Sequence, residues 1–349
     1  MVQNKTLVFK KVPSGVPKPG EDLVIEDRPI DLEQPAPEGG LVVKEIYASF
    51  DPYLRGKMRP AGTKSYSPAF DIDAPIVNDT VSKVLKSNSP DHKEGDLVLG
   101  YLPIAEYARV SKEQMRGIRK VNNPNNFDLA YFLGPLGMPG LTAWAGLHEI
   151  GQPKKGETIF ISSAAGAVGQ VVGQAAKREG LRVIGSVGSD DKLKFITEEL
   201  GFDGGFNYKK EEPLDALKRL CPDGIDIYFE NVGGKQLEAV LECMNNNGRV
   251  PVCGMISGYN QKPEERYGVT NLFHIVAKTL TLKGFLVSQP DFGPKHAKEH
   301  QEQFGKWLAE GSVKAKIHYT EGIDKAAEGL VGMLNGENFG KAVLRISEA

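Results

Sequence analysis

A turn rich in glycine and alanine is the feature that most constrains how this chain folds. It lies in Ser162–Gly173, between the apolar run Thr158–Ser162, which predicts a strand, and Ala167–Lys177, which has the apolar spacing of a helix. Such a turn presents backbone N–H groups and a helix N-terminus to a pyrophosphate. Gly166 would let the backbone approach the phosphates, and Gly169 would let the helix pack closely on the sheet.

The segments after this turn alternate between strand and helix patterns. A helix is predicted over Asp190–Leu200, opened by acidic residues and closed by Gly201. Five further strands are predicted at Arg182–Val187, Phe206–Tyr208, Asp226–Asn231, Arg249–Gly254 and Leu280–Val287. This alternation predicts an α/β fold with a doubly wound parallel sheet. Ala164 replaces the first glycine of the usual fingerprint, but in this context we expect a dinucleotide to contact Ala165, Gly166, Ala167, Val168 and Gly169.

The remaining sequence indicates a second domain. The 349 residues exceed the roughly 250–300 at which single hydrophobic cores stop growing. Up to about residue 130, short apolar runs alternate with turns rich in proline, glycine and aspartate, which is typical of β structure. Beyond about residue 300, elements are predicted at Gln301–Leu308, Ala326–Leu334 and Lys341–Ile346, and we expect this tail to pack on the N-terminal domain. The expected organisation is 1–130, 131–303 and 304–349.

The residues after the second predicted strand favour NADPH over NADH. A site for NADH usually has Asp or Glu about 20 residues after the glycine-rich turn, at the end of that strand. Here Gly185–Ser189 contains no acid, and Asp190 and Asp191 are placed to open a helix. Lys192 would meet a 2′-phosphate as a point charge, and Tyr208 would add a hydrogen bond.

Three other segments end predicted strands, where open α/β sheets bind their ligands. They are Asn231–Gly234, Cys253–Tyr259 and Phe285–Val287. Turn chemistry explains the glycines in these segments but not a polar Asn231 directly after an apolar strand.

Composition argues against several other classes of protein. Lys and Arg total 43 against 45 Asp and Glu, and basic clusters have acidic neighbours, so we expect no nucleic-acid partner. Three cysteines are too few and too irregularly spaced for a disulfide framework. No signal-peptide core is present near Met1, and no apolar run approaches the roughly 18 residues that span a membrane. We therefore expect a cytoplasmic enzyme without a membrane partner.

Metal and nucleophile motifs are weak. The stretch His296–His300 matches the H-x-x-E-H pattern of some zinc proteases, but its polar neighbours indicate a solvated helix face. There is no Gly-x-Ser-x-Gly motif and no set of four closely spaced cysteines for structural zinc. Cys253 falls inside a predicted apolar strand, so we expect an inert thiol. The sequence predicts no metal.

Seven ordered motifs together resemble one family. They are Asp51–Arg55, Gly137–Ala143, Ala164–Gly169, Gly188–Lys192, Phe206–Lys209, Asn231–Gly234 and Gly336–Lys341. They resemble the zinc-independent medium-chain dehydrogenases/reductases, in particular the branch of prostaglandin reductases, leukotriene hydroxydehydrogenases and plant alkenal double-bond reductases. Zinc-dependent members of the superfamily carry a ligand cysteine where this chain has Ala48–Asp51, and a Gly-His-Glu that it lacks.

The resemblance implies a GroES-like β-domain completed by the C-terminal tail, a Rossmann NADPH domain, and an active site in the cleft between them. It also implies a homodimer joined through the sheets of the cofactor domains. Lys192 and Tyr208 are implied to hold the 2′-phosphate beside Gly188. Further implied cofactor contacts are Asn231, Cys253, Gly254, Met255, Ile256, Ser257, Tyr259, Phe285, Leu286, Val287 and Asn338.

The implied reaction is 1,4-reduction of an α,β-unsaturated aldehyde or ketone. Hydride reaches the β-carbon, and the developing enolate is stabilised by Tyr259 and a ribose hydroxyl of the cofactor. Either Tyr259 or water delivers the final proton. Tyr53 would orient the substrate carbonyl, Met138 and Thr142 would shape the nicotinamide face, and Arg55 is a further candidate for the pocket.

Three alternatives remain open from sequence. They are an NADPH quinone reductase, an enzyme that oxidises a secondary alcohol of a lipid mediator, and a non-catalytic NADPH-binding protein.

Overall fold

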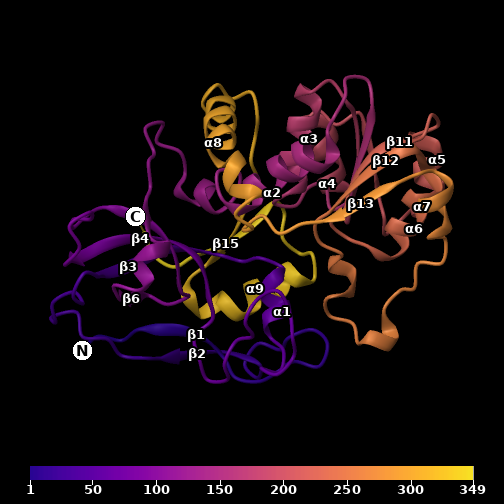
Figure 1. Ribbon diagram of the computed structural model, residues 1–349. Helices are drawn as coiled ribbons and strands as arrows, with labels where there is room; N and C mark the ends of the chain where they lie inside the picture. Colours follow the sequence, from indigo (N-terminus) through magenta and orange to yellow (C-terminus); the bar gives the residue numbers. More distant parts are fainter. Residues whose placement is uncertain (349) are drawn as a thin grey trace. The chain divides into compact units, whose positions relative to one another are not determined.

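The structure, a computed structural model, describes residues 1–348, which divide into two compact units (Figure 1). One unit comprises Met1–Leu133 and the chain from Ile317 onward, and the other comprises Gly134–Lys316. The second boundary therefore lies at 316/317, whereas the sequence suggested 303/304. The reason is helix α8 (Gly293–Ala309), which packs on α2 (Met138–Gly146) and so remains with the second unit.

The unit formed by Gly134–Lys316 is built on a six-stranded sheet in which all the paired strands are parallel. Its order is β10-β9-β8-β11-β12-β13, so the direction of winding reverses between β8 and β11. This confirms the predicted doubly wound sheet, which is a Rossmann fold. The strands are β8 Thr158–Ile161, β9 Arg182–Val187, β10 Gly204–Asn207, β11 Ile225–Phe229, β12 Met244–Val252 and β13 Thr281–Gly284.

Helices cover this sheet, which explains why its central strands are apolar on both faces. They are α3 Gly169–Arg178, α4 Asp190–Lys194, α5 Pro213–Leu220, α6 Gly234–Cys243 and α7 Phe273–Ala277. π-helical turns η3 (Leu147–Gly151) and η4 (Phe195–Glu199) follow α2 and α4. Rings of Phe160, Phe206 and Tyr228 stack in the core of the sheet.

Several predicted boundaries in this unit were wrong. The single helix expected over Asp190–Leu200 is α4 followed by the π-turn η4, and α8 begins at Gly293, eight residues before the predicted Gln301. Strand β12 begins at Met244. Strand β13 ends at Gly284, so Phe285–Val287 lies beyond the strand that was expected to contain it. Hydrophobic periodicity does not fix such ends, because the last turns depend on tertiary contacts.

The other unit contains a seven-stranded sheet of order β14-β15-β3-β4-β5-β7, with β6 paired to β3, and a two-stranded β1-β2 sheet. The strands are β1 Lys5–Phe9, β2 Leu23–Asp27, β3 Leu41–Ser49, β4 Val77–Ser87, β5 Leu97–Pro103, β6 Tyr107–Val110, β7 Arg119–Lys120, β14 Ile317–Glu321 and β15 Lys341–Arg345. Helices α1 (Tyr53–Lys57) and α9 (Ala326–Leu334) complete it. Short 3-10 turns are η1 Gln114–Gly117, η2 Leu129–Leu133, η5 Ile256–Gly258, η6 Pro263–Glu265 and η7 Ile323–Lys325, of which η5 and η6 belong to the Rossmann unit.

The C-terminal tail is part of the N-terminal sheet. Strand β15 pairs antiparallel with β3, with Val343 opposite Ser49, and β14 adds a parallel strand outside it. Helix α9 buries its apolar face in the same core, which includes Phe50 and Leu330. This mixed sheet is the GroES-like β-domain.

A search of helices within residues 1–348 finds none long and apolar enough to cross a bilayer.

Candidate active site

The glycine-rich turn joins the end of β8 to the start of α3. A Cβ atom on Gly169 would lie 2.4 Å from the carbonyl oxygen of Ser163 and 2.8 Å from Cα of Ala164, so only glycine fits. Ala164 itself fits because the residue opposite is Gly185, where an added Cβ would come within 2.6 Å of the Ala164 methyl group. The departure from the usual fingerprint is therefore compensated across the sheet.

The turn is shaped to receive an anion. Gly166, Ala167 and Val168 are only half-buried, and they directly precede the first turn of the ten-residue helix α3. In α3 the N–H groups of Gln170 and Val171 donate to the carbonyls of Gly166 and Val168 at 3.1 and 3.0 Å, which fixes the shape of the turn. The helix dipole adds positive potential there. A pyrophosphate fits this position, as the sequence indicated.

Positive charge gathers at the end of β9, where a 2′-phosphate is expected. An added Cβ on Gly188 would lie 2.9 Å from the hydroxyl oxygen of Tyr208, so the tyrosine lies directly against bare backbone. Burial, and then the nearby charge of Lys209, lower the pKa of Lys192. An anion bound here would offset both effects, so this group of residues suits NADPH.

Asp190, one of the two acids that follow β9, is engaged elsewhere. Asp190 accepts a hydrogen bond from the side-chain amide nitrogen of Asn207 at 2.9 Å. It also forms an ion pair with Lys210 at 2.5 Å. These partners hold the pKa of the Asp190 carboxyl below its usual value. Its oxygens are therefore already bonded and are not available to bind the ribose hydroxyls of a cofactor. An acid that binds those hydroxyls is typical of an NADH site.

Asn231 links the carboxyl ends of β11 and β8, where the winding reverses. Its side-chain nitrogen donates to the Ser162 carbonyl at 2.8 Å, and its backbone N–H donates to the Ser162 hydroxyl oxygen at 2.9 Å. Tyr228 also donates to that hydroxyl, at 3.1 Å. These bonds give the polar Asn231 a structural role that the sequence did not reveal.

Glu230 is a site residue that the sequence analysis missed. Its fully buried carboxylate accepts the backbone N–H of Gly233 and, at 3.2 Å, that of Met255. Its own carbonyl accepts from the N–H groups of Cys253 and Gly254 at 2.9 and 3.1 Å. Burial raises the pKa of Glu230, and the backbone N–H groups act against that rise. An acid at the end of an otherwise apolar run was the signal for this residue.

The loop after β12 is tied to the loop after β11. The N–H groups of Ile256 and Ser257 donate to the carbonyls of Asn231 and Val232 at 3.1 and 3.0 Å, and the Ser257 hydroxyl donates to Val232 at 2.5 Å. The hydroxyl of Tyr259 then donates back to the Gly254 carbonyl at 2.8 Å.

Cys253 lies one residue beyond the end of β12. Burial, and then the charge of Glu230, raise the pKa of its thiol to about 12. The thiol is therefore neutral, as expected for an inert cysteine.

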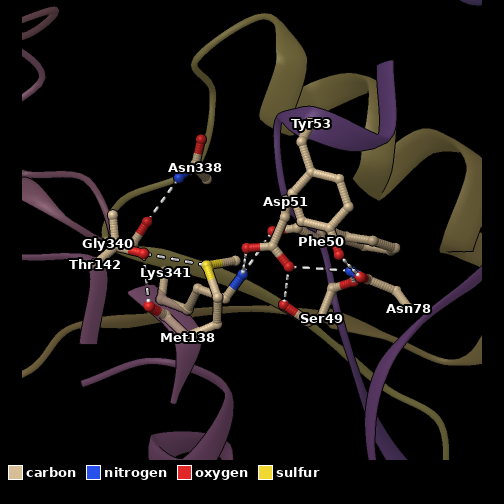
Figure 2. Close-up of polar contacts among 10 residues, drawn as sticks. All are labelled: Ser49, Phe50, Asp51, Tyr53, Asn78, Met138, Thr142, Asn338, Gly340 and Lys341. Carbon is tan, nitrogen blue, oxygen red and sulfur yellow. Dashed lines mark hydrogen bonds and ion pairs between the residues drawn. The ribbon is translucent and has the colours of Figure 1, made fainter. Parts of the chain in front are cut away.

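Two other predicted contacts lie within the same unit. Phe285 stacks on Phe292 with ring centroids 4.9 Å apart, and half-buried Leu286 and Val287 follow it. The hydroxyl of Thr142 donates to the carbonyl oxygen of Met138 at 2.8 Å and lies 3.4 Å from the sulfur of the same residue (Figure 2).

Tyr53, Arg55 and Asn338 belong to the GroES-like unit. Arg55 donates to the Gly15 carbonyl at 2.8 and 3.2 Å, so its guanidinium anchors a loop. The amide nitrogen of Asn338 donates to the Gly340 carbonyl at 2.6 Å (Figure 2).

Tyr53 belongs to a buried polar network (Figure 2). It also hydrogen-bonds with Tyr101, whose hydroxyl accepts from Nζ of Lys57 at 2.8 Å. The Tyr53 hydroxyl donates to Oδ1 of Asn78, whose nitrogen donates to the Ser49 carbonyl at 2.7 Å and to Oδ2 of Asp51 at 3.0 Å. Lys341 donates to Oδ1 of Asp51 at 2.8 Å. Burial, and then the charge of Asp51, raise the pKa of Tyr53 above its usual value, so the phenol stays neutral.

The expectation of a solvated face for His296–His300 was wrong for the two histidines. His300 is fully buried, and its Nε2 donates to the Pro135 carbonyl at 2.8 Å, while His296 lies 3.2 Å from Glu149. Burial lowers the pKa of His300 to about 4. Both side chains face inward because α8 packs on α2. Among residues 1–348, no group of three or more His, Cys, Asp or Glu is arranged to hold a metal ion.

Comparisons with known proteins agree with this architecture. Residues 167–301 match the family described as zinc-binding dehydrogenase, and residues 5–118 match the N-terminal domain of oxidoreductases. The chain is 52% identical to the NADP-dependent oxidoreductase RED1 of Cochliobolus heterostrophus, over 100% of this chain and 99% of that protein. It is 44% identical to a 2-alkenal reductase (NADP(+)-dependent) of Nicotiana tabacum, over 99% and 98% of the two chains. The crystal structure of CurA in complex with NADPH from Vibrio vulnificus has a TM-score of 0.90 and 34% identity, covering 99% of this chain and 100% of that one.

The Rossmann sheet, the GroES-like domain and the NADP-dependent relatives together define an NADP-dependent oxidoreductase. The chain belongs to the zinc-independent medium-chain dehydrogenase/reductase family, which confirms the resemblance of its motifs, and its cofactor is NADPH.

Proposed function

We propose that this chain reduces the activated carbon–carbon double bond of α,β-unsaturated aldehydes and ketones. The observation that carries the proposal is its 44% identity to a 2-alkenal reductase over 99% of the chain. Bound NADPH supplies a hydride to the β-carbon of the substrate. The chain's own residues supply binding, orientation and stabilisation of the charge that develops on the substrate oxygen.

Tyr259 is the proposed donor to that oxygen. Its hydroxyl donates to Gly254 within the loop that Glu230 anchors. Rotation of the hydroxyl from the Gly254 carbonyl to an enolate oxygen transfers one hydrogen bond to the site of developing charge. Tyr259 or a water molecule then delivers the proton to the α-carbon.

The test follows NADPH absorbance with a 2-alkenal, an aryl enone, a quinone and the corresponding saturated aldehyde. Oxidation of NADPH with the alkenal and the enone, yielding the saturated carbonyl, supports the proposal. Turnover of the quinone alone would replace it with a quinone reductase. Tight NADPH binding without turnover of any substrate would replace it with a non-catalytic binding protein.

We also propose that two copies of this chain associate through β13 and α7. Strand β13 is the last strand of its sheet, and edge strands present unpaired backbone groups. Beside it in sequence, the apolar side chains of Phe273, Val276 and Leu272 are 75%, 72% and 50% exposed. A second copy related by a two-fold axis would cover the same residues on both chains.

A further inference from the structure

The backbone of Met255 has a conformation that residues with side chains rarely adopt. Its φ of 58° and ψ of 38° lie in the left-handed region, where a Cβ atom is crowded and glycine is the usual residue. The side chain is 41% exposed, so its burial is not what holds this conformation. Strained residues of this kind persist only where the surrounding structure fixes them.

Hydrogen bonds to the loop after β11 fix the turn at Met255. The N–H of Met255 itself donates to Oε2 of Glu230 at 3.2 Å, and the other oxygen of this carboxylate accepts the N–H of Gly233. The bonds from Ile256 and Ser257 to the same loop begin one residue later. The Glu230 carboxylate therefore joins the two loops at the strained residue.

The two residues that share the Glu230 carboxylate also fit against each other. Gly233 has a φ of 72°, and a Cβ atom added to it would lie 3.1 Å from Cβ of Met255. A side chain at position 233 would be strained by its φ and would crowd Met255. Glu230 is fully buried, so its carboxylate depends on these N–H groups rather than on water for its hydrogen bonds.

We propose that Glu230 is a positioning residue for NADPH and for Tyr259. Its carboxylate holds Met255 in the left-handed conformation and so fixes the loop Cys253–Tyr259, which the sequence predicts to contact the cofactor. Tyr259 ends this loop, with its hydroxyl on the Gly254 carbonyl. The link to Tyr259 rests on the proposed enone reduction, whereas the effect on NADPH binding does not.

Glu230→Gln tests this role because it keeps the shape of the side chain. An amide nitrogen cannot accept an N–H, so the N–H of either Gly233 or Met255 loses its acceptor. We expect the Kd of NADPH, titrated by cofactor fluorescence, to rise by about 5–50-fold, as for the loss of one hydrogen bond to a charged group. Glu45→Gln is the matched control, since Glu45 is equally buried but lies in the other unit, and it should leave this Kd unchanged.

Met255→Gly separates positioning from general damage to the fold. Glycine adopts the left-handed conformation without strain, so a loop with Gly at this position depends less on Glu230. Adding Met255→Gly to Glu230→Gln should therefore lower the Kd of NADPH by about 3–10-fold. Ile256→Gly is the control, because Ile256 lies in the helical turn η5 and glycine there adds backbone freedom without relieving strain. It should recover nothing.

The link to Tyr259 is tested by turnover of an enone at saturating NADPH. If Glu230 acts on kcat by placing the Tyr259 hydroxyl, Glu230→Gln should lower kcat. The double variant with Tyr259→Phe should then have a kcat no lower than Tyr259→Phe alone. Additive effects of the two changes would overturn this link and leave the effect on NADPH binding standing.

The melting temperature identifies the folded variants on which these outcomes are judged. An unchanged Kd of NADPH in folded Glu230→Gln, or equal recovery by Met255→Gly and Ile256→Gly, overturns the role of Glu230 at Met255. If Glu230→Gln does not fold, Glu230→Asp takes its place, because the shorter carboxylate keeps the charge but cannot reach both N–H groups. Absence of enone turnover in the wild type overturns the proposed function, while the cofactor titrations still decide the inference on NADPH.

Discussion

Lys341, on the last strand, donates to Asp51, which precedes the first helix, across 2.8 Å with side chains only 1% and 4% exposed. Replacing Lys341 with Met removes the cation and leaves Asp51 charged in the interior. We expect this change to lower the free energy of unfolding by about 3–5 kcal/mol, as measured by denaturant titration. The control is Lys325→Met, because Lys325 pairs with Glu328 at 3.7 Å on the surface, where a pair contributes about 0–1 kcal/mol. Equal effects of the two changes would contradict a buried charge pair.

Glu45 should make the protein less stable as pH rises. This carboxyl is fully buried, and burial raises its pKa well above the usual value against a smaller opposing effect of the Ala105 backbone. A group whose pKa is raised by folding stabilises the fold fully below its unfolded pKa, and that contribution is lost as pH rises through the folded pKa.

Glu45→Gln should remove that loss. As pH rises from the unfolded to the folded pKa of Glu45, the variant should become more stable relative to the wild type. The gain in its free energy of unfolding should be up to roughly 1.4 kcal/mol per pH unit. Denaturant titrations from pH 5 to 9 measure it, with the exposed Glu94→Gln as control. A difference that does not vary with pH would show that Glu45 ionises as easily when folded as when unfolded.

Lys192 should distinguish NADPH from NADH. Lys192→Ala removes the proposed partner of the 2′-phosphate, and one hydrogen bond to a charged group corresponds to about a 10–100-fold increase in the Kd of NADPH. The Kd of NADH, titrated by cofactor fluorescence, should change little. Lys194→Ala on the same short helix is the exposed control. Equal weakening of both cofactors would exclude a specific role at the phosphate.

Tyr259 should affect turnover more than binding. Tyr259→Phe removes the proposed donor to the enolate oxygen, and the loss of such a donor typically lowers kcat by about 10²–10³-fold. The Kd of NADPH should stay near the wild-type value. Tyr267→Phe is a suitable control because its hydroxyl donates to Glu238 on the surface. Undiminished enone turnover in Tyr259→Phe would remove this residue from the mechanism.

Phe273 should control self-association. Phe273→Asp places a charge on the exposed apolar surface of α7, and we expect it to shift a dimer toward monomer in sedimentation velocity. Tyr66→Asp is the control, since Tyr66 is 62% exposed in the other unit. Wild-type chains that sediment as monomers at all concentrations would contradict the proposed association.

The sequence predicted those features of the fold and the cofactor site that depend on residues close together in the chain. The turn around Gly166, the strands that frame it and the lack of an acid before Asp190 all follow from local spacing. Local spacing therefore indicated a doubly wound sheet and NADPH, both now confirmed. The ends of the elements were less well predicted, because helix α4 passes into a π-turn and β13 stops at Gly284 for reasons of packing.

Only the tertiary structure revealed the polar pairings. Asp51 and Lys341 are 290 positions apart, and Asn78 meets Asp51 across 27 positions, so no periodic pattern relates them. The polar neighbours of His300 indicated a surface residue, but the packing of α8 on α2 buries its side chain. Sequence periodicity reports which side of an element is apolar, whereas the partner of a buried charge or amide depends on which strands the topology makes neighbours. That choice is made by long-range pairing of β3 with β15 and β4.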